Sequence, residues 1–200
     1  MSCQSADNIV GSSGSTQHQE DSNSAIDIDN SVRQHLDMQN QEITVEFTHN
    51  QHDALRTTLD NWVNEAPEEE REVRQQVKDQ IKIDNDQLVV DGNLDLSNTN
   101  ISSLPQGLHV NGVLNLTNCS NLRILPQDLH VRRSLILEDC TSLTTLPQGL
   151  HVKGSLALTN CSNLTILPQG LTVDVYLHIH SCTSLTELPQ RLIVRRWLDL

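Results

Sequence analysis

The sequence predicts an α/β solenoid of leucine-rich repeats, with a parallel β-sheet on its concave face. Five prolines recur every 21 residues, each between a leucine and a glutamine: Pro105, Pro126, Pro147, Pro168 and Pro189. Around each proline the chain repeats L-P-Q-x-L-x-V-x-x-x-L-x-L-x-x-C-x-x-L. A period of roughly 20–29 residues with this leucine pattern is typical of leucine-rich repeats. Three segments are expected: a disordered tail (1–42), a helical N-terminal cap (43–87) and the solenoid (88–200).

The first segment, residues 1–42, is rich in Ser, Gln, Asn and Asp and has few large apolar residues. Such a segment buries too little surface to offset the entropy lost on ordering, so it is predicted to be disordered. Ile43, Val45 and Phe47 then alternate with polar residues, which predicts a short strand or an extended arm.

Two helices are predicted in the cap. The first covers 51–66, where four apolar residues lie at helical spacing: Leu55, Leu59, Trp62 and Val63. Pro67 ends this helix and starts the next, whose apolar edge consists of Val73, Val77 and Ile81. The end of a solenoid must be covered, so these helices are expected to pack on the first coil, with Trp62 in the core rather than in a binding role.

The repeats begin at Leu88, and each L-x-L pair is predicted to form a short strand with both leucines inward. Equivalent leucines recur once per coil: Leu94, Leu114, Leu135, Leu156, Leu177 and Leu198. The 21-residue coil is too short for a full helix on its outer side, so extended or 3₁₀ segments are expected there. Gly107, Gly149 and Gly170 share a turn position that favours positive φ. The chain stops inside a strand at Leu200, so the solenoid is expected to be truncated or uncapped at its C-terminus.

Four cysteines also recur once per coil: Cys119, Cys140, Cys161 and Cys182. Disulfides and a zinc site are the alternatives to a buried ladder of free thiols. The repeat itself sets the spacing, and four sulfurs in a line do not form a tetrahedron, so the sequence favours the thiol ladder. Reduced thiols suit a cytosolic environment.

The candidate partner-binding site lies on the concave face, at the outward positions between the leucines. Early coils place small polar residues there, whereas late coils place aromatic and charged residues, which are the usual anchors of protein interfaces. The predicted site comprises Tyr176, His178, His180, Trp197, Asp199, Ile136 and Glu138. The alternative for Trp197 is packing against a missing C-terminal cap.

Two sets of polar residues have both a functional and a structural interpretation. His109, His130 and His151 occupy one position in three coils and could bind a metal or sense pH, but repeat duplication also explains them. Four arginines, in two pairs, form a solvated rim that could steer an acidic partner: Arg132, Arg133, Arg195 and Arg196. His178 and His180 lack a third ligand for zinc. No metal and no cofactor are expected.

Charge and motifs exclude several classes of function. The formal net charge is −13, and residues 1–87 carry 18 acidic and six basic side chains, whereas residues 88–200 carry eight and seven. This balance argues against nonspecific nucleic-acid binding and against an anionic membrane surface. No apolar stretch reaches the length of a membrane span, and the first thirty residues do not resemble a signal peptide. No catalytic motif is found, so the chain is not expected to be an enzyme.

The chain runs from a Ser-rich tail into a cap that contains Trp62-Val63, Ala66-Pro67 and Glu70-Arg71, and then into Leu94-Asp95-Leu96-Ser97 and the proline-bearing repeats. This order resembles the leucine-rich-repeat effectors that pathogenic bacteria inject into host cells, and the resemblance spans roughly residues 50–200. It implies a virulence protein secreted without a signal peptide, which acts in the host cytoplasm and binds a host or bacterial protein; the alternative location is the bacterial cytoplasm.

Members of that family often continue into an E3 ubiquitin ligase domain with a catalytic cysteine. The present chain shows no such domain within its 200 residues and lacks the doubled L-P-x-x-L-P of the family. The function expected is therefore a protein–protein interaction module. The alternative is the substrate-recognition part of a ligase effector whose catalytic domain is absent from this chain.

Overall fold

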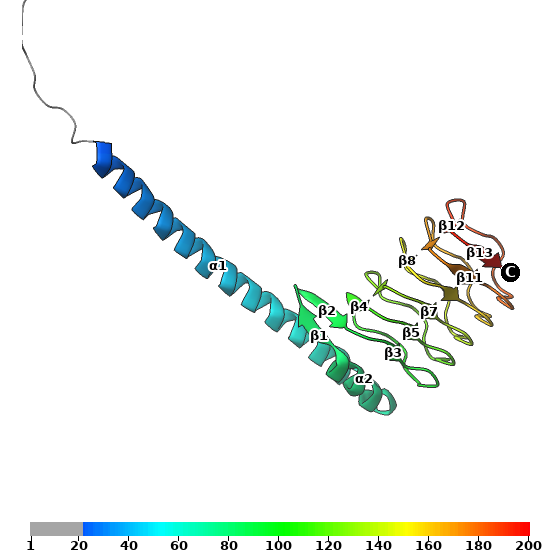
Figure 1. Ribbon diagram of the computed structural model, residues 1–200. Helices are drawn as coiled ribbons and strands as arrows, with labels where there is room; N and C mark the ends of the chain where they lie inside the picture. The colour runs from blue at the N-terminus through cyan, green and yellow to red at the C-terminus, as the bar shows by residue number, and fades with distance from the viewer. Residues whose placement is uncertain (1–21) are drawn as a thin grey trace, which may run out of the picture. The chain divides into compact units, whose positions relative to one another are not determined.

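The computed structural model describes the backbone of residues 22–200, and the side chains from residue 32 onward except those of residues 43 and 45–49 (Figure 1). The chain divides into two units, Met1–Phe47 and Thr48–Leu200. The second unit is a repeat solenoid with parallel strands about 21 residues apart and helices at its N-terminal end, so the predicted fold class is confirmed.

Helix α1 (Ser22–Asn64) is longer than the predicted helix over 51–66. Residues 1–21 of the predicted disordered tail lie outside the described residues, but residues 22–42 are helical, and so is the 43–47 segment predicted as a strand or an arm. The composition argument considered only buried surface. A helix satisfies its backbone hydrogen bonds internally, and no glycine or proline interrupts the chain between Ser22 and Asn64. The helix ends three residues before Pro67, as the proline predicts.

Helix α2 (Glu68–Gln80) starts directly after Pro67, which has φ −50° and ψ 148°. Three glutamates occupy its first turn and Lys78 its last, which is the arrangement that the helix dipole favours. Val77 is fully buried, and Val73, Ile81 and Trp62 pack against the core. The predicted apolar edge of the cap helix and the core role of Trp62 are therefore confirmed.

A buried ion pair that the sequence did not predict joins the cap to the first coil. The Arg74 guanidinium donates to Glu70 Oε2 through Nε (3.1 Å) and Nη2 (2.9 Å), and both residues are buried. The same Glu70 oxygen accepts from the backbone amide (3.1 Å) and hydroxyl (3.0 Å) of Ser102. Arg74 Nη1 donates to the Trp62 carbonyl at 2.7 Å. One carboxylate and one guanidinium thus connect α1, α2 and the first coil.

A hairpin follows α2, where only helix had been predicted for the cap. Strands β1 (Lys82–Asp84) and β2 (Gln87–Val90) pair antiparallel around Asn85 and Asp86, whose φ angles are 48° and 57°. Two consecutive residues with positive φ make the type I′ turn that suits a two-residue hairpin. Through β2, which contains the predicted repeat start Leu88, the hairpin joins the first coil.

The coils form two sheets. The six-stranded sheet has the order β13-β11-β9-β7-β5-β3, all parallel. Its strands are β3 (Leu94–Asp95), β5 (Leu114–Asn115), β7 (Leu135–Ile136), β9 (Leu156–Ala157), β11 (Tyr176–His178) and β13 (Trp197–Asp199). The seven-stranded sheet has the order β1-β2-β4-β6-β8-β10-β12. Its further strands are β4 (Leu108–Val110), β6 (His130–Val131), β8 (His151–Val152), β10 (Thr172–Val173) and β12 (Ile193–Val194).

The predicted register of the six-stranded sheet is confirmed. Leu94, Leu114 and the equivalent leucines up to Leu198 pair directly with one another from coil to coil. The seven-stranded sheet is new relative to the sequence analysis, which expected extended or 3₁₀ segments on the outer side of the coil but no strand pairing there. Its inward valines stack in the same way, with Val110 opposite Val90 and Val131.

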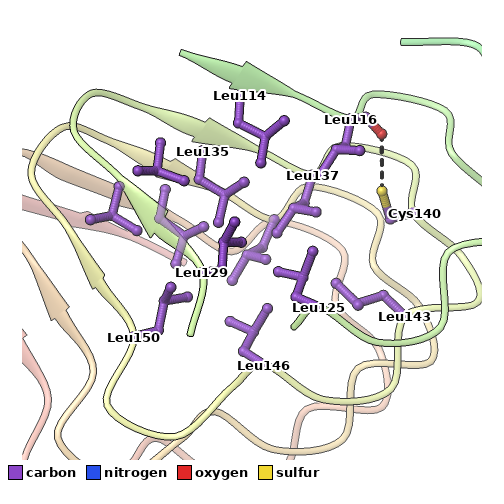
Figure 2. Close-up of a cluster of buried hydrophobic side chains, with 14 of the residues drawn as sticks. Leu114, Leu116, Leu125, Leu129, Leu135, Leu137, Cys140, Leu143, Leu146 and Leu150 are labelled. Atoms are coloured by element: carbon purple, nitrogen blue, oxygen red, sulfur yellow. Dashed lines mark hydrogen bonds between the residues drawn. The ribbon is translucent and has the colours of Figure 1, made fainter. Parts of the chain in front are cut away.

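The leucines of successive coils point into one interior (Figure 2). Leu114, Leu116 and Leu135 have no exposed surface, and the cluster continues along the solenoid through the later coils. Among the helices of the described residues, none has an apolar stretch long enough to cross a bilayer.

The cysteine ladder is confirmed as buried free thiols. Each sulfur donates to a leucine carbonyl of the preceding coil; Cys140 Sγ lies 3.1 Å from the Leu116 oxygen, as the dashed line in Figure 2 shows. Burial raises the pKa of the Cys140 thiol to about 12. Cys119 and Cys140 are therefore structural donors rather than thiolates, whereas the hydrogen bond with Cys161 lowers the pKa of the Cys182 thiol to about 7.

One turn position in each coil adopts a left-handed conformation. It is filled by Asn98, Asn118, Asp139, Asn160 and Ser181, with φ angles of 58° to 61°. Asn and Asp tolerate this region better than other side chains, which explains the recurrence. In the turn after the proline, positive φ is confirmed for the three predicted glycines, whereas among the described residues Asp128 and Arg191 at the same position do not adopt it.

Candidate functional site

Five of the seven residues predicted for the site come together at the C-terminal end of the six-stranded sheet. Tyr176 is directly opposite Trp197, and His178 is opposite Asp199, on the neighbouring strands β11 and β13. Side chains alternate along a strand, and Leu177 is fully buried, so Tyr176 and His178 face outward. The repeat pattern therefore positions this cluster by burying the residue between each outward pair.

Two of the few aromatic residues of the protein stand opposite each other in this cluster. The chain contains two tryptophans, one tyrosine and one phenylalanine. Trp197 is 69% exposed and Tyr176 is 37% exposed, and the Tyr176 ring lies 6.0 Å from the His178 ring. An exposed tryptophan beside an exposed tyrosine offers a large apolar surface that loses little conformational entropy on binding.

A carboxylate connects the two histidines of the cluster. Asp199 Oδ2 lies 2.9 Å from His180 Nε2 and 3.3 Å from His178 Nδ1. The pKa of Asp199 lies below its usual range because of the hydrogen bond from His180 and, after it, that from His178. The aromatic pair is therefore bordered by a polar group that holds negative charge and can donate or accept hydrogen bonds through its imidazoles.

Ile136 and Glu138 lie on the same face but outside this cluster. Ile136 pairs with Ala157, which pairs with His178, so Ile136 is two strands away. At about 4.8 Å per strand, this separation is roughly 10 Å along the sheet. Glu138 occupies the position of His180 two coils earlier. A large ligand could contact both groups, whereas a small one could not.

The early coils of this face use their polar side chains internally. Asn93 Oδ1 accepts from the Val113 amide at 2.8 Å, and Ser134 Oγ accepts from the Ser155 amide at 3.1 Å. These groups link neighbouring coils and are engaged in the structure of the sheet. The late coils replace them with Tyr176 and Trp197, so the exposed aromatic surface is concentrated at the C-terminal end.

A second cluster lies on the seven-stranded sheet, where the sequence left a histidine ladder with two interpretations. The rings of His109 and His130 are stacked, with centroids 4.3 Å apart and planes inclined by 8°. The third member, His151, instead places Nε2 3.2 Å from Asp174 Oδ2. Within the described part of the chain, no group of three or more His, Cys, Asp or Glu side chains is arranged to hold a metal ion.

Comparisons of the chain with protein-family models, curated proteins and solved structures found no match. The class of protein is accordingly defined by its own fold: a repeat solenoid with two parallel sheets and a helical N-terminal end.

Proposed function

We propose that this protein is a protein–protein interaction module that binds its partner on the outward face of the six-stranded sheet, at the C-terminal coils. One observation carries the proposal: Trp197 and Tyr176 are exposed side by side on a rigid sheet. Binding energy at protein interfaces concentrates in such aromatic residues. The leucines of the repeats are buried in the interior, so only the outward-facing residues of the strands can contact a partner.

The polar border of the aromatic pair supports a partner with a mixed surface. Asp199 keeps its negative charge to a lower pH than an ordinary aspartate, and His178 and His180 add hydrogen-bonding groups. The best complement is an apolar side chain that packs between the aromatic rings, next to a basic or hydrogen-bonding group. This pattern of an apolar centre with a polar rim is that of specific interfaces.

The effector role is a further part of the proposal. The order of Ser-rich tail, helical cap and short proline-bearing repeats supports a bacterial protein that is secreted without a signal peptide and binds a host protein. A fusion of this chain to a reporter enzyme that is active only in host cytoplasm tests export directly. Signal from infected cells that depends on the secretion apparatus supports the effector role, whereas retention in the bacterium contradicts it.

The binding site is tested by capture from host-cell lysate with the full chain and with the variant Tyr176→Ala/His178→Ala/Trp197→Ala. The matched control is Ile124→Ala/Ile166→Ala, which removes exposed apolar surface elsewhere on the solenoid. For a partner retained by the parent and the control, truncation of hot-spot residues is expected to weaken binding by at least about 2 kcal/mol, measured by calorimetry. Equal affinity for all three proteins, with unchanged circular dichroism, would place the binding site elsewhere.

A further inference from the structure

A groove of about 370 Å³ runs across the outward side of the seven-stranded sheet, and most of the residues that line it carry a hydrogen-bond donor in the side chain. The imidazoles of β4, β6 and β8 form one row, and the residues that directly follow these strands form the next: Asn111, Arg132 and Lys153. Both rows line the groove. No carboxylate lines it.

The cations of this groove lack partners among the described residues. No described carboxylate lies within ion-pair distance of Arg132 or Lys153. One coil further on, by contrast, Asp174 pairs with Arg195 (2.8 Å) and with His151 (3.2 Å). The positive charge of Arg195 is therefore neutralised near the C-terminal end of the sheet, whereas that of Arg132 and Lys153 in the middle is not.

The stacked imidazoles make this positive charge sensitive to pH. Burial holds the pKa of His109 below its usual range, and the charges of His130 and Arg132 add to that effect, while Asp128 opposes it. Two protonated rings 4.3 Å apart repel each other unless an anion lies beside them. An anion in the groove would supply that charge and would favour protonation of both rings.

We propose that this groove is a binding site for a doubly charged tetrahedral oxyanion of the phosphate or sulfate type. His109, His130, Arg132 and Lys153 would supply the hydrogen bonds and charge. A tetrahedral anion has enough acceptors for donors that come from two rows and several strands, whereas a single carboxylate has two oxygens. This site lies on a different sheet from the proposed protein-binding surface and does not depend on it.

The affinity of the groove for the oxyanion is expected to increase as the pH falls. The titratable groups that line the groove are the imidazoles of His109, His130 and His151, and the charged groups around them are Arg132, Lys153, Asp128 and Asp174. His109 gains its proton at a lower pH than an ordinary histidine, because burial and the neighbouring positive charges lower its pKa. Anion binding is therefore coupled to proton uptake.

Sulfate is the probe of choice, because its charge is constant while the imidazoles titrate. The full chain is titrated with sodium sulfate at constant ionic strength, balanced with chloride, at about pH 6 and about pH 8. The imidazole signals are followed by NMR and assigned with His109→Asn and His130→Asn. Saturable shifts of both signals are expected, with at least about tenfold tighter binding at the lower pH. Shifts that match those of chloride, or that do not saturate, overturn the proposal.

Charge-matched variants separate the site from general screening. Arg132→Gln/Lys153→Gln is expected to abolish saturable sulfate binding, whereas Arg123→Gln/Arg191→Gln, which removes two exposed cations outside the groove, is expected to preserve it. Equal effects of the two variants overturn the proposal. A parallel titration with inorganic phosphate and with a phosphoserine peptide identifies the source of the anion: tighter binding of the peptide indicates a phosphorylated protein, and tighter binding of free phosphate indicates a small molecule.

Discussion

At the residue scale, each repeat cysteine supplies one hydrogen-bond donor to an interior that is otherwise apolar. Cys119 Sγ donates to the Leu96 carbonyl at 3.1 Å, and Cys161 Sγ donates to the Leu137 carbonyl at 3.0 Å. The first coil has Thr99 in the equivalent position, and its hydroxyl donates to the same Leu96 carbonyl at 2.8 Å. The Leu116 and Leu137 carbonyls also accept from the backbone amides of Cys119 (3.1 Å) and Cys140 (3.3 Å), so each thiol adds a second hydrogen bond to a buried carbonyl.

The burial of the thiols predicts slow chemical modification. In the variant Cys3→Ser/Cys182→Ser, the remaining Cys119, Cys140 and Cys161 are expected to resist a disulfide-exchange reagent at about pH 8, because the reaction needs thiolates and burial raises the pKa of Cys119 and Cys140. The absorbance of the released thiolate measures the rate. The same sample in denaturant should react fully, and rapid reaction of the native protein would contradict a closed ladder.

The inward and outward positions of one strand predict unequal effects of two neighbouring substitutions. Leu156 is fully buried, so Leu156→Ala is expected to lower the free energy of unfolding by about 2–5 kcal/mol. Ser155 is half-exposed on the outward row, and Ser155→Ala is expected to change the free energy of unfolding by less than about 0.5 kcal/mol. Urea denaturation followed by circular dichroism measures both. Similar losses for the two variants would show that the assigned register is wrong.

At the element scale, the cap is joined to the solenoid by polar contacts as much as by apolar packing. The Arg74 guanidinium lies over the Trp62 ring at 5.1 Å, and Trp62 Nε1 donates to Ser103 Oγ at 3.3 Å. Together with the Glu70–Arg74 pair, these contacts fix both helices on the first coil. They also satisfy the buried polar groups: among the described side chains, no buried nitrogen or oxygen lacks a hydrogen-bond partner.

The buried ion pair predicts that one substitution is more harmful than two. Arg74→Met leaves the Glu70 carboxylate buried without its cation, and is expected to cost about 3–5 kcal/mol. Glu70→Gln/Arg74→Met removes both charges and keeps an oxygen for the Ser102 amide, so it is expected to cost less than Arg74→Met alone. Unfolding by urea gives both values. A double variant that loses as much as Arg74→Met, or more, would contradict this prediction.

At the scale of the whole molecule, the core belongs to the second unit, Thr48–Leu200. Among the described residues, every buried apolar side chain lies at Leu59 or later, and those of α1 from residue 32 to 42 are exposed. The continuous cluster of leucines, valines and cysteines runs from Val77 to Cys182. Each coil buries its apolar side against its neighbours, so the stability of a solenoid is distributed along its length.

This distribution predicts that the second unit is stable without the first. A chain of residues 48–200 is expected to melt within about 3 °C of the full chain, because the deletion removes no described core residue. Circular dichroism measures the melting temperature, and the helical signal should fall in proportion to the residues removed from α1. A markedly lower melting temperature would mean that residues 1–47 stabilise the solenoid.

The sequence by itself determined the repeat period, the register Leu94 to Leu198, the inward leucines and the thiol ladder. These features follow from side-chain spacing within one coil, which a repeating pattern displays directly. It also indicated the exposed aromatic residues, because the outward positions follow once the inward ones are known. Its prediction of disorder over 22–42 differed from the structure, because it weighed burial and not the hydrogen bonds within a helix.

Only the tertiary structure decided which polar groups meet. Glu70 and Ser102 are 32 residues apart, and no periodicity relates them. The contact of Asp199 with two histidines depends on how neighbouring coils stack. The strand pairing in the seven-stranded sheet depends on it too. Buried apolar positions can be recognised from the periodicity of the sequence, whereas a hydrogen bond or an ion pair depends on the position of a particular atom in space.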